Sequence, residues 1–142
     1  MKTKLNSLLI TTAGLTLSAV SLQTAAFGQT RIVANVPFSF TTAAGVQQPG
    51  RYTISPVTQD AAVMALKNAK TRTTSVIGVG APSDAEQHAK PRLVFTCGSE
   101  SGCALTGVVV DEGRAWTYKA PRLKASETER VAVIYFESKQ AE

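Results

Sequence analysis

Alternation of apolar and polar residues is the clearest structural signal in this sequence, and it is strongest over residues 31–40. The apolar positions of this run are Ile32, Ala34, Val36, Phe38 and Phe40. A period of two predicts a β-strand with one strongly apolar face. Pro37 interrupts the run, and because proline has no N–H to donate to a ladder, it predicts an edge position or a bulge. A second strand is predicted to begin near Arg51, after the turn residues Pro49 and Gly50.

Further short strands are predicted along the rest of the chain, separated by turn signals. They lie at residues 61–69, 71–79, 92–97, 103–110, 115–118 and 130–137. The first of these segments also fits a short helix, and its short length between turn-rich flanks favours a strand. The last follows a capping-box pattern, Ser126 and Glu129, but its β-branched and aromatic residues favour a strand over a helix. Residues 80–91 are rich in glycine, proline and charge and are predicted to form a loop.

Together these patterns predict an all-β protein. About seven to eight short strands with turns at intervals of roughly ten residues are typical of a single-domain antiparallel β-sandwich or a small β-barrel. The edges of such a fold matter for function. If the apolar last strand is unpaired, it is a possible site of strand addition or of self-association.

The first 28 residues have the pattern of an export signal. Lys2 and Lys4 precede an uncharged apolar stretch, residues 8–22, and Ala26 and Gly28 supply small residues before a cleavage site at Gln29. The stretch is short and interrupted by threonines and serines, so a transmembrane anchor is the weaker interpretation. We therefore expect a signal peptide at residues 1–28, one β-rich domain at 29–142 without a transmembrane segment, and a periplasmic or secreted location.

Charge adds little evidence of a specific partner. The chain has 15 basic and 10 acidic residues, a net charge of +5. Without Lys2 and Lys4 the mature chain has 13 basic residues and a net charge of +3. Because these residues are scattered and not interleaved with aromatic side chains, nucleic acid is not expected as a partner.

The two cysteines, Cys97 and Cys103, are separated by the loop sequence Gly-Ser-Glu-Ser-Gly. In an oxidising compartment an even pair of cysteines most simply forms a disulfide. This pair would close the hairpin between the strands predicted on either side. Five intervening residues fit neither a C-x-x-C redox motif nor a zinc knuckle, so a redox or metal role is the weaker alternative.

Two groups of polar residues are candidates for catalysis or metal binding. His88, the only histidine, follows Asp84 and Glu86 in the predicted loop, where a carboxylate can orient an imidazole. Asp111 and Glu112 are adjacent carboxylates, but neighbours on a turn usually point apart into water. We interpret both groups as solvated, and we predict no catalytic residues, no metal and no cofactor.

A different candidate is a binding face in the C-terminal third. It comprises Trp116 and Tyr118 together with Arg114, Lys119 and Arg122. In a sandwich the aromatic residues most often pack in the core. If they instead lie on a loop beside the three cations, they form a possible face for a carbohydrate or an acidic polymer.

Three short motifs give the chain a resemblance to known sequences. They are Val36-Pro-Phe-Ser-Phe, then Gln48-Pro-Gly-Arg-Tyr-Thr-Ile, then Pro91-Arg-Leu-Val-Phe. The chain resembles a family of small exported bacterial β-rich proteins of unknown function whose members carry VPF-x-F, LPAG-x-Y-x-I and LVF motifs. It departs from that pattern by having Gln48-Pro49 where the family has Leu-Pro-Ala, and by the loop between the two cysteines. The resemblance implies a β fold and export and implies no activity.

From the sequence we expect an interaction or structural module of the cell envelope that is not an enzyme and whose partner is an envelope protein or polymer. The alternative is a protein that binds a small molecule, either an apolar ligand held inside the sheet or a carbohydrate.

Overall fold

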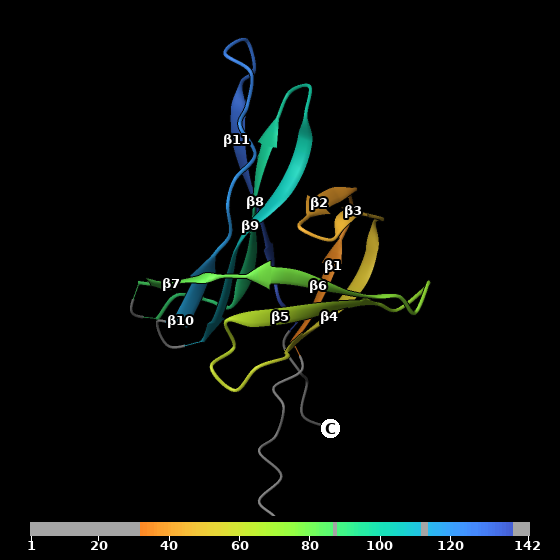
Figure 1. Cartoon of the computed structure of the whole chain (residues 1–142), viewed down its shortest axis with the longest axis vertical. Coiled ribbons are helices and arrows are strands. Elements are labelled where there is room, and N and C mark those ends of the chain that lie inside the picture. The colour runs from red at the N-terminus through yellow and green to blue at the C-terminus, as the bar shows by residue number, and fades with distance from the viewer. Residues whose placement is uncertain (1–31, 87, 112–113, 138–142) are drawn as a thin grey trace, which may run out of the picture.

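A computed structural model describes residues 32–86, 88–111 and 114–137. Every regular element among these residues is a β-strand, and the strands form two sheets in a sandwich-like arrangement that does not close into a barrel (Figure 1). The all-β prediction is confirmed, and of its two architectures the sandwich is the one that forms. No helix that is long and apolar enough to cross a membrane occurs in the described part of the chain. The expected export signal lies outside the described residues.

The smaller sheet has four strands, and the larger has seven. The smaller sheet runs in the order β1 (Ile32–Val36), β4 (Gly50–Pro56), β5 (Val63–Asn68), β6 (Thr74–Val79). The larger sheet runs in the order β11 (Glu129–Tyr135), β8 (Arg92–Gly98), β9 (Gly102–Asp111), β10 (Arg114–Thr117), β7 (Ala81–Asp84). Two short strands, β2 (Phe40–Thr42) and β3 (Gly45–Gln47), complete it, with β2 parallel to β9 and antiparallel to β3. In Figure 1 the upper ends of β8, β9 and β11 project beyond the rest of the molecule as an arm.

The segment predicted as one strand over residues 31–40 is two strands in different sheets. β1 pairs with β4 at the edge of the smaller sheet, whereas β2 pairs with β9 in the larger one. Pro37 lies between them, where no ladder donor is needed. The apolar alternation continues across the break because both strands face one core: Ala34, Val36 and Phe40 are all almost completely buried.

A second difference concerns residues 80–91, which were expected to form a loop. Residues 81–84 form β7, which pairs with β10. β7 carries a proline and only one partly buried side chain, so it has no period-two signal, and its position at an edge tolerates the proline. With β7, and with β2 and β3 separate from β1, the described residues contain eleven strands rather than seven or eight.

The two ambiguous segments are both strands, as predicted. Residues 63–68 form β5 in the interior of the smaller sheet, and residues 129–135 form β11. The arm carries the predicted disulfide between Cys97 and Cys103, which are register partners on β8 and β9.

The core lies between the two sheets and is centred on four aromatic rings. Phe40 packs edge-on against Tyr52 of the smaller sheet and against Phe95 of the larger one, with ring centroids 5.4 and 5.1 Å apart. Phe38 adds a third contact, with its ring centroid 5.1 Å from that of Phe95. The Tyr52 hydroxyl donates a hydrogen bond to the carbonyl of Gln48, which satisfies the one polar atom of the cluster.

The chain passes from the smaller sheet to the larger at Gly80, between β6 and β7. A Cβ at this position would lie 2.8 Å from Cβ of Trp116 and 3.2 Å from two ring carbons of Tyr118. Glycine is therefore required here by close approach to β10 and not by a left-handed backbone.

We expect Gly80→Val to lower the free energy of unfolding by about 1–3 kcal/mol, because the added side chain overlaps Trp116. Guanidinium denaturation of the purified protein measures this change. The matched control is Ala81→Val, an exposed neighbour on β7 that should shift stability by no more than about 0.5 kcal/mol. Equal effects at the two positions would contradict the packing argument.

Removing the disulfide by the double substitution Cys97→Ala and Cys103→Ala should cost about 2 kcal/mol, the value of the loop-closure model for so short a ring. Denaturation of the wild-type protein with and without a thiol reductant provides the control. Reductant should destabilise the wild type by a similar amount and leave the double variant unchanged. A wild type that is insensitive to reductant would contradict this account of the arm.

Candidate functional site

The surface that stands out chemically is the outer edge of β11. β11 is the last strand in the order of the larger sheet and pairs on one side with β8, so its other edge pairs with no strand of the described residues. It is also poorly covered: its seven residues are exposed or half-buried, whereas alternate residues of the neighbouring β8 are buried. An edge strand of this kind is a template for pairing with another chain.

The register with β8 shows which backbone groups of β11 are available. Phe136 donates its N–H to the carbonyl of Pro91 at the end of the β11–β8 ladder. Because hydrogen-bonded residues alternate along an antiparallel pair, the groups of Ala132 and Ile134 also point toward β8. The N–H and C=O groups of the intervening residues therefore point away from β8: these residues are Glu129, Val131, Val133 and Tyr135.

The side chains of the same alternate residues form an exposed apolar row. Val131 is 58% exposed, Val133 39% and Tyr135 59%. On the opposite face of the strand, Ala132 and Ile134 pack against the core. β11 therefore offers a partner both unpaired backbone groups and apolar side chains.

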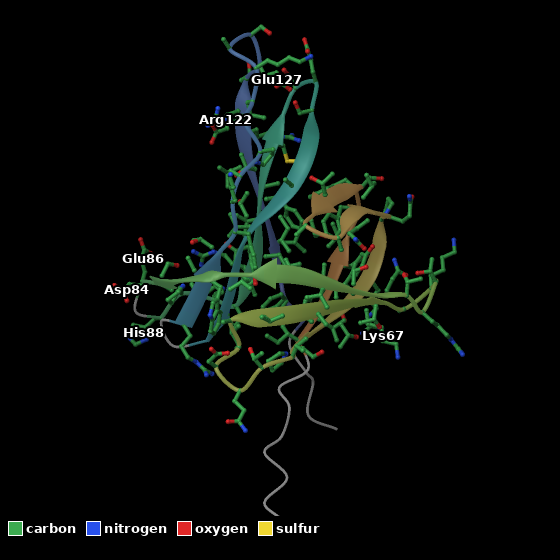
Figure 2. All side chains as sticks on the ribbon, viewed as in Figure 1. Lys67, Asp84, Glu86, His88, Arg122 and Glu127 are labelled. Atoms are coloured by element: carbon green, nitrogen blue, oxygen red, sulfur yellow. A yellow bond between two sulfur atoms is a disulfide. The ribbon has the colours of Figure 1, made fainter. Side chains whose placement is uncertain are left out.

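The chain just before β11 is anchored by the carboxylate of Glu127, at the tip of the arm (Figure 2). The carboxylate accepts hydrogen bonds from the backbone N–H groups of Glu100 (3.0 Å), Ser101 (2.6 Å) and Lys124 (2.7 Å). The Ser101 hydroxyl also contacts both carboxylate oxygens, at 2.7 and 2.8 Å. We call this group of contacts the Glu127 clasp, and it joins the segment before β11 to the turn between β8 and β9.

The clasp depends on the charged form of the carboxyl group. Hydrogen bonds from the Ser101 hydroxyl and from the Lys124 N–H, in that order of importance, lower the pKa of Glu127 from 4.5 to about 2.

Gly98 leaves the space that the carboxylate occupies, because a Cβ there would lie 2.7 Å from Oε1 of Glu127 and 2.7 Å from Cδ2 of Leu123.

The other end of β11 is anchored to the smaller sheet. The N–H of Glu137 donates to the carbonyl of Val33 on β1 at 2.8 Å, and the Glu137 carboxylate forms an ion pair with Arg51 of β4 at 2.6 Å. Both ionic side chains are exposed, so the pair contributes little energy, and the backbone bond is the firmer link. With both ends held, the outward groups of residues 129–135 are fixed in an extended conformation before any partner arrives.

The face suggested by the sequence in the C-terminal third is only partly at the surface. Trp116 on β10 is 6% exposed and belongs to the core, in line with the packing interpretation of the aromatic residues. Tyr118 is half-buried, and burial of its hydroxyl raises its pKa to about 12. Arg114, Lys119 and Arg122 are exposed. The indole ring is thus not available to stack on a ligand in this structure.

None of the polar groups considered for catalysis or metal binding belongs to β11. Asp84, Glu86 and His88 are exposed near the end of β7, as Figure 2 shows. Within the described ranges no three His, Cys, Asp or Glu side chains gather closely enough to hold a metal ion. Glu112, and with it the predicted carboxylate pair, falls outside the described residues.

Sequence patterns did not reveal the Glu127 clasp. The local signal, Ser126 with Glu129, resembles a helix cap, but the residue that binds backbone N–H groups is Glu127, and two of its partners are 26 and 27 positions away. Only the pairing of β8 with β9 and β11 brings these groups together.

In comparisons with known proteins, no family model, no curated protein and no solved structure matches the chain.

The clasp generates a pH-dependent prediction. Because folding lowers the pKa of Glu127, the clasp contributes its full stability above the unfolded value near 4.5 and loses it as the pH falls toward 2. Glu127→Gln should therefore be less stable than the wild type at pH 7, and the difference should shrink between pH 5 and pH 2. Denaturation curves across this range measure the difference.

Hydrogen exchange shows which backbone amides the Glu127 carboxylate protects. The backbone amides of Glu100, Ser101 and Lys124 should exchange faster in Glu127→Gln than in the wild type at neutral pH. The control is Glu129→Gln, two residues away on the exposed side of β11, which should leave these three amides unchanged. If the two variants behave alike, the carboxylate is not the anchor of this segment.

Proposed function

We propose that this protein is an exported, non-catalytic interaction module of the cell envelope, and that it binds its partner by adding a strand to β11. The observation that carries the proposal is the anchored free edge of β11, with outward backbone groups and an exposed apolar row. Strand addition gains affinity from main-chain hydrogen bonds and specificity from the alternate side chains.

Comparison with the other edges supports β11 as the binding edge. β7 has four residues and a proline, β3 has three residues, and β1 has five and meets Glu137 at Val33. β6 has six residues, but the β2–β3 hairpin packs close to it: Ser75 donates to the side chain of Gln47, and Gly78 lies near Ala43. β11 has seven residues and no proline. Short, proline-containing or covered edges resist pairing. β11 is the longest of these edges, and β1 lies beside its end, where Glu137 bonds Val33.

The disulfide supports the expected location. Cys97 and Cys103 account for both cysteines of the chain and are joined. Disulfides persist in oxidising compartments and are rare in the cytosol. Together with the expected signal at residues 1–28, this bond favours a periplasmic or secreted protein.

A photo-crosslinking experiment in the exporting cell tests the proposal. A photoreactive p-benzoylphenylalanine in place of Tyr135 should give a discrete crosslinked product, because this side chain borders the proposed partner strand. The same residue in place of Val79 is the matched control, since Val79 is 78% exposed but lies on β6. Adding Val133→Lys to the first variant should abolish its product, because a lysine on an edge strand opposes pairing.

A product at position 135 that is absent at position 79 supports strand addition at β11, whether the partner is another protein or a second copy. Absence of a product at position 135, or equal products at both positions, would overturn the proposal.

A further inference from the structure

The positive charge of this protein is concentrated at one end of the smaller sheet. Residues 32–83 contain four basic residues and one acidic residue, a net charge of +3. Residues 84–142 contain eight basic and nine acidic residues, a net charge of −1. Such a charge asymmetry between two parts of a chain is typical of proteins that bind a membrane or nucleic acid.

Three of the four basic residues of this part lie together at one tip of the sheet. Lys67 is on β5, and Lys70 and Arg72 lie in the turn of residues 69–73 that joins β5 to β6. All three residues are exposed, and their side chains form no ion pair or hydrogen bond with another side chain of the described residues. We call these three residues the β5–β6 cations. The fourth basic residue, Arg51, is paired with Glu137.

Acidic residues of the same part of the chain do not neutralise the β5–β6 cations. Asp60 is the one acidic residue of residues 32–83, and it lies in the turn at the opposite end of β5. β5 has six residues and is therefore roughly 17 Å long, about twice the distance at which physiological salt screens a charge. Glu137 is engaged with Arg51 at 2.6 Å. The three charges therefore remain available to an anionic partner.

The turn that carries two of these cations is held in one conformation by Asn68. Asn68 is 3% exposed, and its Oδ1 accepts hydrogen bonds from the N–H groups of Lys70 at 2.8 Å and Thr71 at 3.1 Å. The N–H of Arg72 donates to the Asn68 carbonyl at 2.9 Å. The backbone of the turn is thus ordered before a partner binds, which lowers the entropy that binding costs.

The β5–β6 turn projects at one side of the molecule, away from the arm, as Figure 1 shows. Lys67 lies beside this turn (Figure 2). Cations on a projecting turn can all meet a planar surface at once. We propose that the β5–β6 cations bind the anionic phosphate headgroups of a lipid bilayer surface. This surface is separate from the edge of β11, so the proposal does not rest on strand addition.

The shape and composition of the tip favour a bilayer surface over an anionic chain such as a nucleic acid. Proteins that hold single-stranded nucleic acid use a positively charged groove that follows the backbone, and aromatic side chains on which the bases stack. The β5–β6 cations lie at a projecting turn, and residues 67–74 contain no aromatic side chain. A planar array of headgroups needs neither a groove nor a stacking platform.

The turn contains no large apolar side chain, since residues 69–73 are Ala-Lys-Thr-Arg-Thr. Binding is therefore electrostatic, at the level of the headgroups, without insertion into the acyl chains. Each cation close to an anionic bilayer strengthens binding about fivefold, so three cations give about a hundredfold. High salt should release the protein, because the screening length falls to about 3 Å at 1 M.

Vesicle sedimentation with the exported protein tests the proposal. One set of vesicles is phosphatidylcholine alone, and the other contains about one third phosphatidylglycerol, both in about 0.1 M NaCl. The wild type should bind the anionic vesicles about a hundredfold more tightly, and about 1 M NaCl should release it. The triple variant Lys67→Gln, Lys70→Gln, Arg72→Gln should bind both sets of vesicles equally weakly.

The matched control removes the same charge elsewhere. The triple variant Lys90→Gln, Lys119→Gln, Arg122→Gln replaces three exposed cations outside the smaller sheet, and it should keep its preference for the anionic vesicles. Denaturation curves with the wild-type midpoint show that both triple variants are folded. Lys67→Gln alone changes a residue outside the turn and should weaken binding to the anionic vesicles about fivefold.

Equal binding of the wild type to both sets of vesicles would overturn the proposal. Equal losses in the two triple variants would also overturn it, because they would show an effect of net charge alone. Release by inorganic phosphate, but not by NaCl of the same ionic strength, would identify a site for free phosphate instead of a bilayer surface. Capture of soluble polygalacturonate without vesicle binding would make an acidic polysaccharide the partner. A missing photo-crosslink at position 135 would overturn strand addition and leave this proposal standing.

Discussion

The packing of Phe40 between Tyr52 and Phe95 is the contact on which the two-sheet structure depends. Tyr52 belongs to the smaller sheet and Phe95 to the larger, and the Phe40 ring contacts both edge-on. Each sheet alone would expose one apolar face to water, and burial of these faces against each other is the main favourable term in such a fold. The crossings at Pro37 and Gly80 exist because the chain must supply strands to both sides of this core.

The same requirement explains why β11 is the exposed element. The larger sheet extends beyond the smaller one as the arm in Figure 1, and the order of strands leaves β11 at its margin. β11 buries its Ala132 and Ile134 face partly against the core, and its other face is exposed. No strand forms a ladder with its outer edge among the described residues, and β1 lies beside the end of that edge, where Glu137 bonds Val33. An edge strand with exposed apolar residues is an aggregation hazard in a monomer. The hazard is removed when a partner strand pairs with that edge, and this is the physical basis of the proposed function.

The anchors at the two ends of β11 bear on how such pairing would operate. A free strand must lose conformational entropy when it pairs, at a cost of roughly 1–2 kcal/mol per residue for the backbone. The Glu127 clasp and the Glu137–Val33 hydrogen bond order β11 when the protein itself folds, so β11 loses this entropy before a partner binds. The disulfide lies in the same arm and joins β8, the strand with which β11 pairs, to β9. These contacts therefore hold the edge of β11 in one extended conformation.

The sequence by itself determined the β class, the positions of most strands and the cysteine pair, because each of these depends on short-range properties: the period of two, the turn residues and the spacing of two cysteines across a hairpin. It also indicated that the last strand is apolar and would be a site of strand addition or self-association if its edge were unpaired. The tertiary structure decided the rest. It divided one alternating run between two sheets at Pro37, made residues 81–84 a strand through pairing with β10, and buried Trp116. It also brought Glu127 to amides 26 and 27 residues away and left β11 at the margin. These features depend on which strands become neighbours, and that is fixed by the burial of the whole core and not by any local pattern.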